Sequence, residues 1–251
     1  MPFATPPEKM ERELPLPLTR ETARAPHAAR GDLEPRSRRK HIDRAVNIII
    51  ASFGLVLISP LMLIIAALVK LTSPGPIFYT QPRVGIDRRR AAGSLSTYDR
   101  RTRDIGGLPF MIYKFRTMRV GAESRNGAVW ATKGDARVTP LGGVMRKLRL
   151  DELPQLFNVL IGDMNIVGPR PERPSIFSRL RVDIGEYPLR QRTRPGITGW
   201  AQINQSYDTS FDDVRRKVQY DLEYLQRQGV REDLRIMAKT VPVILFRKGG
   251  W

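Results

Sequence analysis

Asp151 and Glu152 are two neighbouring acids, separated by one leucine from a short basic stretch, residues 146–149. Pro154 lacks an N–H, so it fits a helix only in the first turn. If a helix begins at about Glu152, then Asp151 is its N-cap and lies at the positive end of the helix dipole, which favours an ionised carboxylate. An ionised acid beside several cations suits chemistry on a phosphate group. From spacing alone, however, a plain helix cap is the commoner explanation.

Arg170 stands between two prolines, Pro169 and Pro171. Each proline fixes its own φ, and Pro171 also pushes Arg170 into an extended conformation. An arginine restrained in this way loses little entropy when its planar guanidinium group binds a phosphate. The pattern therefore indicates a phosphate-binding residue rather than a solvated loop.

Residues 110–118 alternate in the manner of a β-strand. A period of two places Lys114 and Arg116 on one face, with Tyr113 and Phe115 on the other. Two cations that project from one face can hold a diphosphate, although a solvated strand face is the commoner reason for such a pattern.

The overall composition excludes several kinds of site. The 251 residues carry a formal net charge of +18, which predicts anionic partners: phosphate groups, nucleic acid or an acidic membrane surface. There is no Cys, so thiolate nucleophiles and thiolate metal sites are excluded. The two histidines, His27 and His41, precede the first apolar stretch, which leaves acid–base chemistry to Asp and Glu. No Walker-type or Gly-x-Gly-x-x-Gly motif occurs, so phosphate recognition must rest on Arg and Lys.

The residues at positions 45–69 form an uncharged run long enough to cross a bilayer as a helix. Pro60, preceded by Ser59, lies inside it and should kink the helix. Both flanks are basic, and the positive-inside tendency would place both ends on the cytoplasmic face. A helix–break–helix that enters one leaflet and returns satisfies both features. An ordinary kinked transmembrane helix is the alternative, because prolines are tolerated in membrane spans.

The other patterns predict short elements around these residues. Residues 1–38 read as a disordered tail, and residues 86–108 as a solvated basic loop. Thr139 and Pro140 are good first residues for a helix that leads towards Arg149. Strands are expected at 77–79 and 165–167, a helix over 214–225, and a segment lying in the membrane surface over 234–246.

Taken in order, these stretches resemble the bacterial sugar transferases, the monotopic polyprenyl-phosphate glycosyl-1-phosphate transferases, in their small exopolysaccharide form. The match covers about residues 38–246, with motifs at 59–60, 70–76, 81–85, 113–118, 149–155, 158–164, 167–172, 194–204 and 221–224. Three features depart from the family pattern. The loop 86–108 is longer than usual, Asn165 stands where Ser is commoner, and the long multi-span N-terminal region of larger members is not seen.

The resemblance implies an α+β, mainly helical fold. It implies a monotopic membrane protein with a disordered tail (1–38), a re-entrant helix–break–helix (39–72) and a cytoplasmic catalytic domain (73–251). That domain should contain short β-strands and amphipathic helices at the membrane interface. The expected location is the cytoplasmic face of the bacterial inner membrane.

The resemblance also implies a two-step transfer. Asp151 attacks the β-phosphate of a nucleotide diphosphate sugar, with UDP-glucose or UDP-galactose as the expected donor, and polyprenyl (undecaprenyl) phosphate then takes the sugar phosphate. Glu152 would position the metal or the acceptor, and Mg²⁺ would bind at Asp151. The phosphate-binding residues would be Lys114, Arg116, Arg149 and Arg170. The expected partners are these substrates and membrane lipid, without nucleic acid, and the protein is a possible homodimer.

Two alternatives of other classes remain open from the sequence. A basic, membrane-attached binding protein for nucleic acid or acidic lipid would use the arginines but has no need of Asp151 and Glu152. A transferase that passes on the sugar without its phosphate would release nucleoside diphosphate instead of monophosphate.

Overall fold

The computed structural model describes residues 35–36, 40–87, 106–121, 135–205 and 210–246. The expected tail over 1–38 and the expected basic loop over 86–108 therefore lie almost entirely outside the described residues. The described ranges include the whole uncharged run 45–69 and both acids, Asp151 and Glu152.

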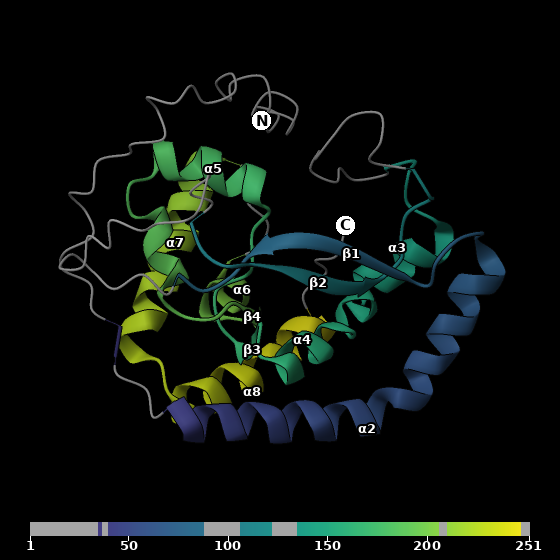
Figure 1. Ribbon diagram of the computed structural model, residues 1–251, viewed down its shortest axis with the longest axis horizontal. Helices are drawn as coiled ribbons and strands as arrows, with labels where there is room; N and C mark the ends of the chain where they lie inside the picture. Colours follow the sequence, from purple (N-terminus) through teal and green to yellow (C-terminus); the bar gives the residue numbers. More distant parts are fainter. Residues whose placement is uncertain (1–34, 37–39, 88–105, 122–134, 206–209, 247–251) are drawn as a thin grey trace.

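The described chain is mainly helical, with a few short strands, as the sequence predicts (Figure 1). The α-helices are α2 (Lys40–Thr72), α3 (Pro140–Lys147), α4 (Gln155–Ile161), α5 (Pro174–Asp183), α6 (Trp200–Asn204), α7 (Phe211–Arg227) and α8 (Val230–Phe246). Two 3-10 helices, η2 (Leu150–Glu152) and η3 (Tyr187–Arg192), lie between them. The strands are β1 (Phe78–Val84), β2 (Pro109–Phe115), β3 (Asn165–Val167) and β4 (Gly196–Thr198).

The strands form two small sheets. β1 and β2 pair antiparallel, with Lys114 opposite Tyr79, and this hairpin crosses the middle of the molecule (Figure 1). β3 and β4 pair in parallel, with Asn165 opposite Gly196. In Figure 1, α3 lies towards one end of the hairpin, α5 and α7 lie towards the other, and α4 and α8 lie between the hairpin and α2.

Helix α2 is a single uninterrupted helix but is bent into two arms (Figure 1). Pro60 lies inside it, and interior prolines are the commonest cause of such bends. The missing N–H of Pro60 would have donated to the carbonyl of Val56, four residues earlier. The hydroxyl of Ser59 donates to that same carbonyl at 2.9 Å, so the proline does not leave it unpaired. The predicted interruption at Ser59 and Pro60 is thus a bend within one helix rather than a gap between two.

One face of α2 packs on the rest of the protein while most of its surface stays exposed. Within the described residues it is the one helix long and apolar enough to cross a membrane, and its most apolar window is only 11% buried. Buried Ala51 packs with Phe110 and Met164. Asn47 accepts a hydrogen bond from the backbone N–H of Ile166 at 2.7 Å, which joins α2 to β3.

The helix over 214–225 is confirmed as part of α7. Its predicted apolar stripe is buried, with Val214, Val218 and Leu222 packed in one cluster with Phe177 and Tyr187. This cluster joins α5, η3 and α7.

Candidate active site

Asp151 and Glu152 lie in η2, a tight turn between α3 and α4. Each is only 7% exposed. The turn is entered through Arg149, whose φ of 56° is left-handed. It is closed by hydrogen bonds from the Glu152 N–H to the carbonyl of Arg149 (3.2 Å) and from the Leu153 N–H to the carbonyl of Leu150 (3.4 Å).

The expected helix start is therefore corrected. The α-helix begins at Gln155 with Pro154 as its N-cap, so Asp151 is not the N-cap. The sequence placed the start three residues early because Pro154 is compatible with a helix only near its first turn, and that rule alone does not distinguish a preceding 3-10 turn. The pair of acids is held by the turn instead.

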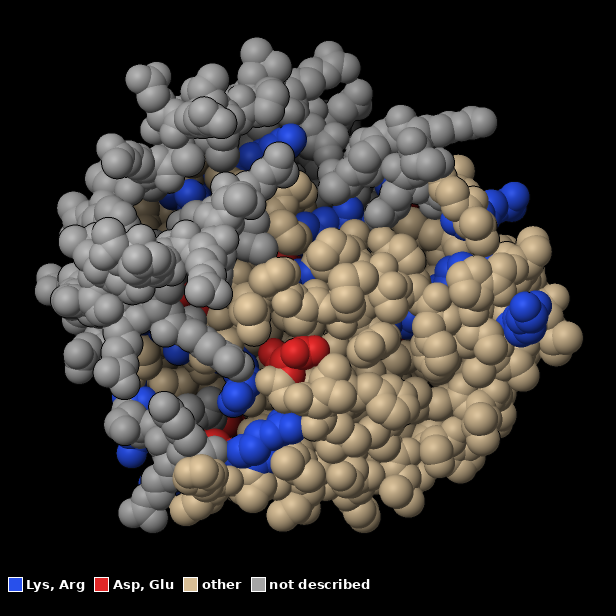
Figure 2. All heavy atoms as spheres, viewed as in Figure 1, with Lys and Arg blue, Asp and Glu red and all other residues tan. Residues whose placement is uncertain are grey.

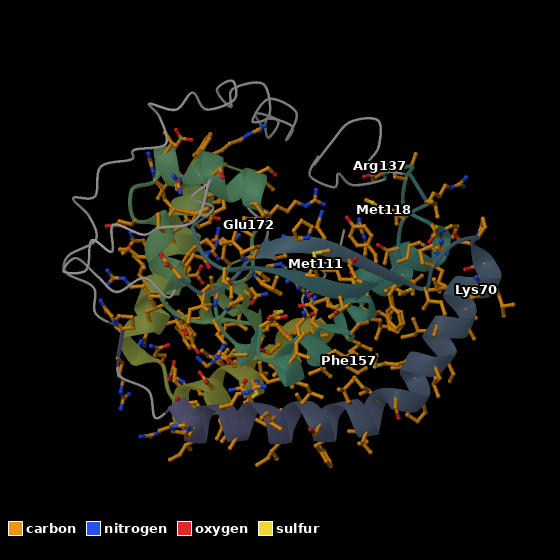
Figure 3. All side chains as sticks on the ribbon, viewed as in Figure 1. Lys70, Met111, Met118, Arg137, Phe157 and Glu172 are labelled. Carbon is orange, nitrogen blue, oxygen red and sulfur yellow. The ribbon has the colours of Figure 1, made fainter. Side chains whose placement is uncertain are left out.

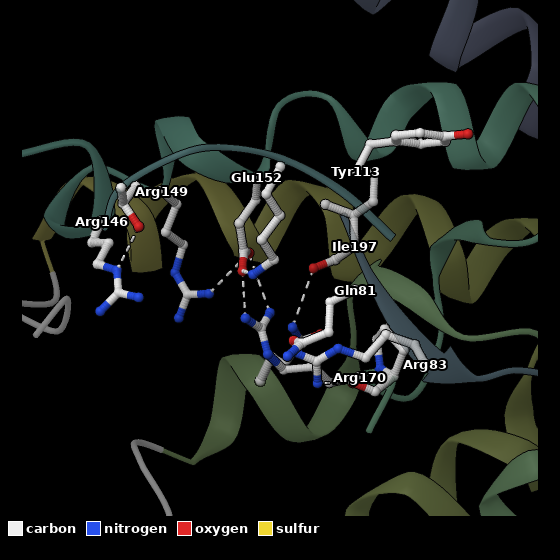
Figure 4. A network of polar contacts seen from close by, with 12 residues as sticks. Gln81, Arg83, Tyr113, Arg146, Arg149, Glu152, Arg170 and Ile197 are labelled. Carbon is white, nitrogen blue, oxygen red and sulfur yellow. Dashed lines mark hydrogen bonds and ion pairs between the residues drawn. The ribbon is translucent and has the colours of Figure 1, made fainter. Parts of the chain in front are cut away.

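Glu152 is surrounded by three of the four predicted phosphate-binding cations (Figure 4). The ammonium group of Lys114 donates to Oε1 at 2.8 Å. Arg170 approaches as a fork, with Nη1 donating to Oε2 at 3.2 Å and Nη2 to Oε1. Arg149 adds a third charge, with Nη1 3.6 Å from Oε2.

The two acids have opposite electrostatic environments. Burial raises the pKa of Asp151 above its usual value, and the charge of Glu152 adds to that effect while Lys114 opposes it. Burial also acts on Glu152, but Arg170 and Lys114 outweigh it and hold the pKa of Glu152 well below its usual range. Glu152 is therefore the more firmly ionised acid of the pair, and Asp151 is the acid that gains a proton first as the pH falls.

Strand β2 brings Lys114 to the acids. Tyr113, the residue before it, points away from Glu152, as expected from strand alternation (Figure 4). Burial lowers the pKa of Lys114, and Glu152 opposes this shift. Asn158 of α4 fixes the strand, because its side chain accepts from the Tyr113 N–H at 3.0 Å and donates to the Met111 carbonyl at 2.7 Å.

The structure does not place Arg116 with the other cations. β2 ends at Phe115, so the alternation that would have aligned Arg116 with Lys114 stops one residue too early. Its guanidinium group instead donates to carbonyls at the end of α2, to Ser73 at 2.6 Å and to Pro74. Carbonyls at a helix C-terminus lack partners within the helix, and a cation there is favourable. The structure thus places Arg116 at the C-terminal end of α2.

Two arginines near the site were not among the predicted residues. Arg83 lies beside Arg170 (Figure 4) and donates to Gln81 Oε1 at 2.9 Å and to the Pro171 carbonyl at 3.0 Å. Arg190 is fully buried and pairs with Asp221, with Nη2 2.7 Å from Oδ2. Arg83 falls inside a motif that the sequence singled out, whereas nothing in the local pattern marks Arg190.

The site offers a divalent metal ion few protein ligands. No group of three or more His, Cys, Asp or Glu side chains that could hold a metal is found among the described residues. Mg²⁺, however, is commonly held by one or two carboxylates together with substrate phosphates and water. Because the oxygens of Glu152 already receive Lys114 and Arg170, Asp151 is the better candidate ligand.

Comparison with known proteins places most of the chain in one family. The family model for bacterial sugar transferases matches residues 38–247. The chain is 42% identical to a UDP-N-acetylgalactosamine-undecaprenyl-phosphate N-acetylgalactosaminephosphotransferase of Aeromonas hydrophila, over 88% of this chain and 47% of that protein. It is 40% identical to the UDP-glucose:undecaprenyl-phosphate glucose-1-phosphate transferase of Escherichia coli K12, over 80% of this chain and 39% of that protein.

These two relatives are therefore more than twice as long as the segment they share with this chain. A shorter relative, the exopolysaccharide production protein ExoY of Sinorhizobium fredii, is 34% identical over 83% of this chain and 87% of its own length. The family match covers most of the chain and includes the whole acid–cation cluster, that is, Asp151, Glu152, Lys114, Arg149 and Arg170. The chain belongs to the bacterial sugar transferase family.

Proposed function

We propose that this protein is a phosphoglycosyl transferase that moves a sugar 1-phosphate from a nucleotide diphosphate sugar to undecaprenyl phosphate. The observation that carries the proposal is the buried Asp151 beside an ionised Glu152 that holds three cations. A protein that only binds nucleic acid or acidic lipid would gain nothing from two buried carboxylates beside its arginines, because carboxylates repel an anionic ligand. The names of the relatives from Aeromonas hydrophila and Escherichia coli describe transfers of this kind.

In the first step, a carboxylate oxygen of Asp151 attacks the β-phosphorus of the donor. A bond forms between that oxygen and phosphorus, the bond from phosphorus to the bridging oxygen breaks, and nucleoside monophosphate leaves with the electron pair. In the second step, a phosphate oxygen of undecaprenyl phosphate attacks the same phosphorus and releases Asp151. Splitting the transfer in this way lets one carboxylate serve a soluble donor and a membrane-bound acceptor in turn.

The surrounding cations stabilise the charge that develops on the phosphates. Lys114, Arg149 and Arg170 are held in place by Glu152 before any substrate binds, so they need little reorganisation during the reaction. Mg²⁺ bound at Asp151 would supply further charge neutralisation. Glu152 acts in this scheme as the common counter-ion that orders the three cations.

The donor sugar is proposed to be a UDP-hexose, UDP-glucose or UDP-galactose in the first place, with an N-acetylated hexose as the second candidate from the first relative named above. The test is to incubate purified protein, undecaprenyl phosphate and Mg²⁺ with a panel of sugar nucleotides. Release of nucleoside monophosphate with one donor supports the proposal. Release of nucleoside diphosphate would indicate transfer of the sugar without its phosphate, and release of neither would favour a binding protein.

We further propose that α2 is re-entrant, with both of its ends at the cytoplasmic face of the inner membrane. Both ends are fastened to the same catalytic part. Near the first end, Arg44 donates to the carbonyls of Val159 and Leu160 at 2.5 and 2.6 Å. At the other end, Arg116 donates to the carbonyl of Ser73. A full span would separate the two ends by the thickness of the bilayer, and these contacts would then be lost.

The charge distribution agrees with this arrangement. Figure 2 shows a nearly uncharged surface over α2, with Lys and Arg near its two ends, and Lys70 lies at the far end of the second arm (Figure 3). Apolar side chains on the short helices are exposed as well. Val144 of α3 is 55% exposed, and Phe157 and Ile161 of α4 are 44% and 63% exposed. These residues support the expectation of helices that lie at the membrane interface.

The topology predicts that both chain ends lie in the cytoplasm. Single cysteines introduced as Arg30→Cys and Trp251→Cys into this Cys-free chain should both resist a membrane-impermeant thiol reagent in intact cells, and both should react after lysis. Labelling of one end only in intact cells would show that α2 spans the membrane. Pro60→Leu, which removes the cause of the bend, should shift part of the population towards that spanning form.

A further inference from the structure

Arg190 is the most completely buried charged residue among the described ones, with 0% exposure. Each part of its guanidinium group is used. Nε donates to Asp221 Oδ2 at 2.9 Å, Nη1 donates to the hydroxyl of Tyr187 at 2.9 Å, and Nη2 lies 2.7 Å from the same Asp221 oxygen. Its guanidinium carbon also lies 5.0 Å from the centre of the Tyr187 ring.

Arg190 remains charged in this environment. Burial alone would favour loss of its proton, but Asp221, followed by Tyr187, outweighs burial and raises the pKa of Arg190 above its usual value. A buried ion pair is costly to form, and apolar residues of similar volume often stabilise a protein as well or better. Stability alone is therefore a weak reason for this pair.

A further hydrogen bond of Arg190 leads to the proposed active site. Its Nη2 donates to the backbone carbonyl of Arg170 at 3.0 Å. That carbonyl lies between Pro169 and Pro171, in a stretch where the chain has little freedom. The side chain of the same Arg170 then reaches Glu152. A continuous series of contacts thus runs from Asp221 in α7, through Arg190 in η3, to Arg170 and Glu152.

We propose that Arg190 is a positioning residue that holds the backbone of Arg170 so that the Arg170 guanidinium group is aimed at Glu152 and at the phosphates of the donor. The inference rests on the proposed transferase function. Asp221 has the supporting part of keeping Arg190 charged and oriented. The prolines on either side of Arg170 restrict its φ and ψ, and Arg190 fixes where the restricted segment sits.

The test is a double-mutant cycle on the donor half-reaction. Arg190→Met with Asp221→Leu removes both buried charges and keeps apolar volume in the core. With Arg170 present, this pair of changes should lower kcat/KM for the donor by about 10- to 30-fold. In an Arg170→Ala background, the same pair should lower kcat/KM by less than about twofold, because there is no longer a guanidinium group to position.

A matched control separates positioning from general loss of stability. Tyr224 of α7 is also buried, and its hydroxyl lies 2.7 Å from Asp233 Oδ1 and 3.2 Å from the carbonyl of Val167, three residues before Arg170. Tyr224→Phe removes a buried polar contact from the same helix to the same segment without touching Arg170. It should lower the melting temperature but change donor kcat/KM by less than about twofold.

Equal losses with Arg170 present and in the Arg170→Ala background would overturn the proposal, since Arg190 would then act independently of Arg170. If the doubly substituted protein does not fold, Arg190→Lys in the same cycle replaces it. Lysine keeps the charge beside Asp221 but lacks the planar fork that serves three partners at once, and the same difference between backgrounds is expected. Failure of the proposed function would look different, because the wild-type protein itself would then release no nucleoside monophosphate.

Discussion

Asp151→Asn is expected to abolish turnover, with a fall in kcat of at least about 1,000-fold, because the amide cannot act as the nucleophile. The change keeps the size of the side chain, and it removes a carboxyl group whose ionised form is disfavoured by burial. The fold should therefore survive, with a melting temperature at or above that of the wild-type protein. The measurement is nucleoside monophosphate release at saturating donor and acceptor, together with thermal unfolding.

The pH dependence gives an independent check on Asp151. Because burial raises the pKa of this acid, the ionised form that attacks phosphorus is lost at a higher pH than for an exposed Asp. The rate of the donor half-reaction should therefore fall on the acid side as the pH drops through that raised pKa. Activity of Asp151→Asn close to the wild-type level at any pH would rule out Asp151 as the nucleophile.

Glu152→Gln is the second change with a large expected effect. It leaves Lys114, Arg149 and Arg170 without the carboxylate with which all three pair. The NH₂ group of the new amide would also face the N–H groups of these cations, from which it cannot accept a hydrogen bond. Hydrogen bonds to charged groups contribute about 1.5–3 kcal/mol each, so kcat/KM for the donor should fall by about 100-fold. Unlike Asp151→Asn, this variant keeps its nucleophile and should still form a covalent adduct, slowly.

The control for Glu152→Gln is Glu223→Gln, which removes a partly buried acid from α7. Glu223 accepts from the indole N–H of Trp200 at 2.7 Å and pairs with Arg227, not with Lys114, Arg149 or Arg170. It should leave donor kinetics within about twofold of wild type. A Glu152→Gln enzyme with wild-type kcat/KM would show that the three cations do not depend on Glu152 for their arrangement.

The sequence was most informative where covalent geometry restricts the chain. Pro60 and Ser59 predicted the bend in α2, and the structure shows the hydroxyl of Ser59 on the carbonyl that Pro60 leaves without a donor. The stripe at Val214 and Val218 predicted the buried face of α7 from helical period alone. Such features follow from local rules that tertiary structure rarely overrides.

The sequence was less informative where an element ends and where a contact is distant. Arg116 was grouped with Lys114 because the alternation continues through it in the sequence, whereas β2 ends at Phe115 and the side chain turns to the end of α2. Strand ends are set by pairing with a partner strand, which the local pattern does not encode. Arg190 reaches Asp221 across 31 positions and Arg170 across 20, so only the folded chain shows the link.

The covalent intermediate is the most direct test of the chemistry proposed for Asp151. Wild-type protein is incubated with the sugar nucleotide and Mg²⁺ but without undecaprenyl phosphate, then digested and analysed by mass spectrometry. We expect release of at most one nucleoside monophosphate per protein and a mass increase of one sugar phosphate on the peptide that contains Asp151. The adduct should disappear when undecaprenyl phosphate is added. Turnover with both substrates but no adduct, or an adduct on another residue, would contradict the two-step mechanism through Asp151.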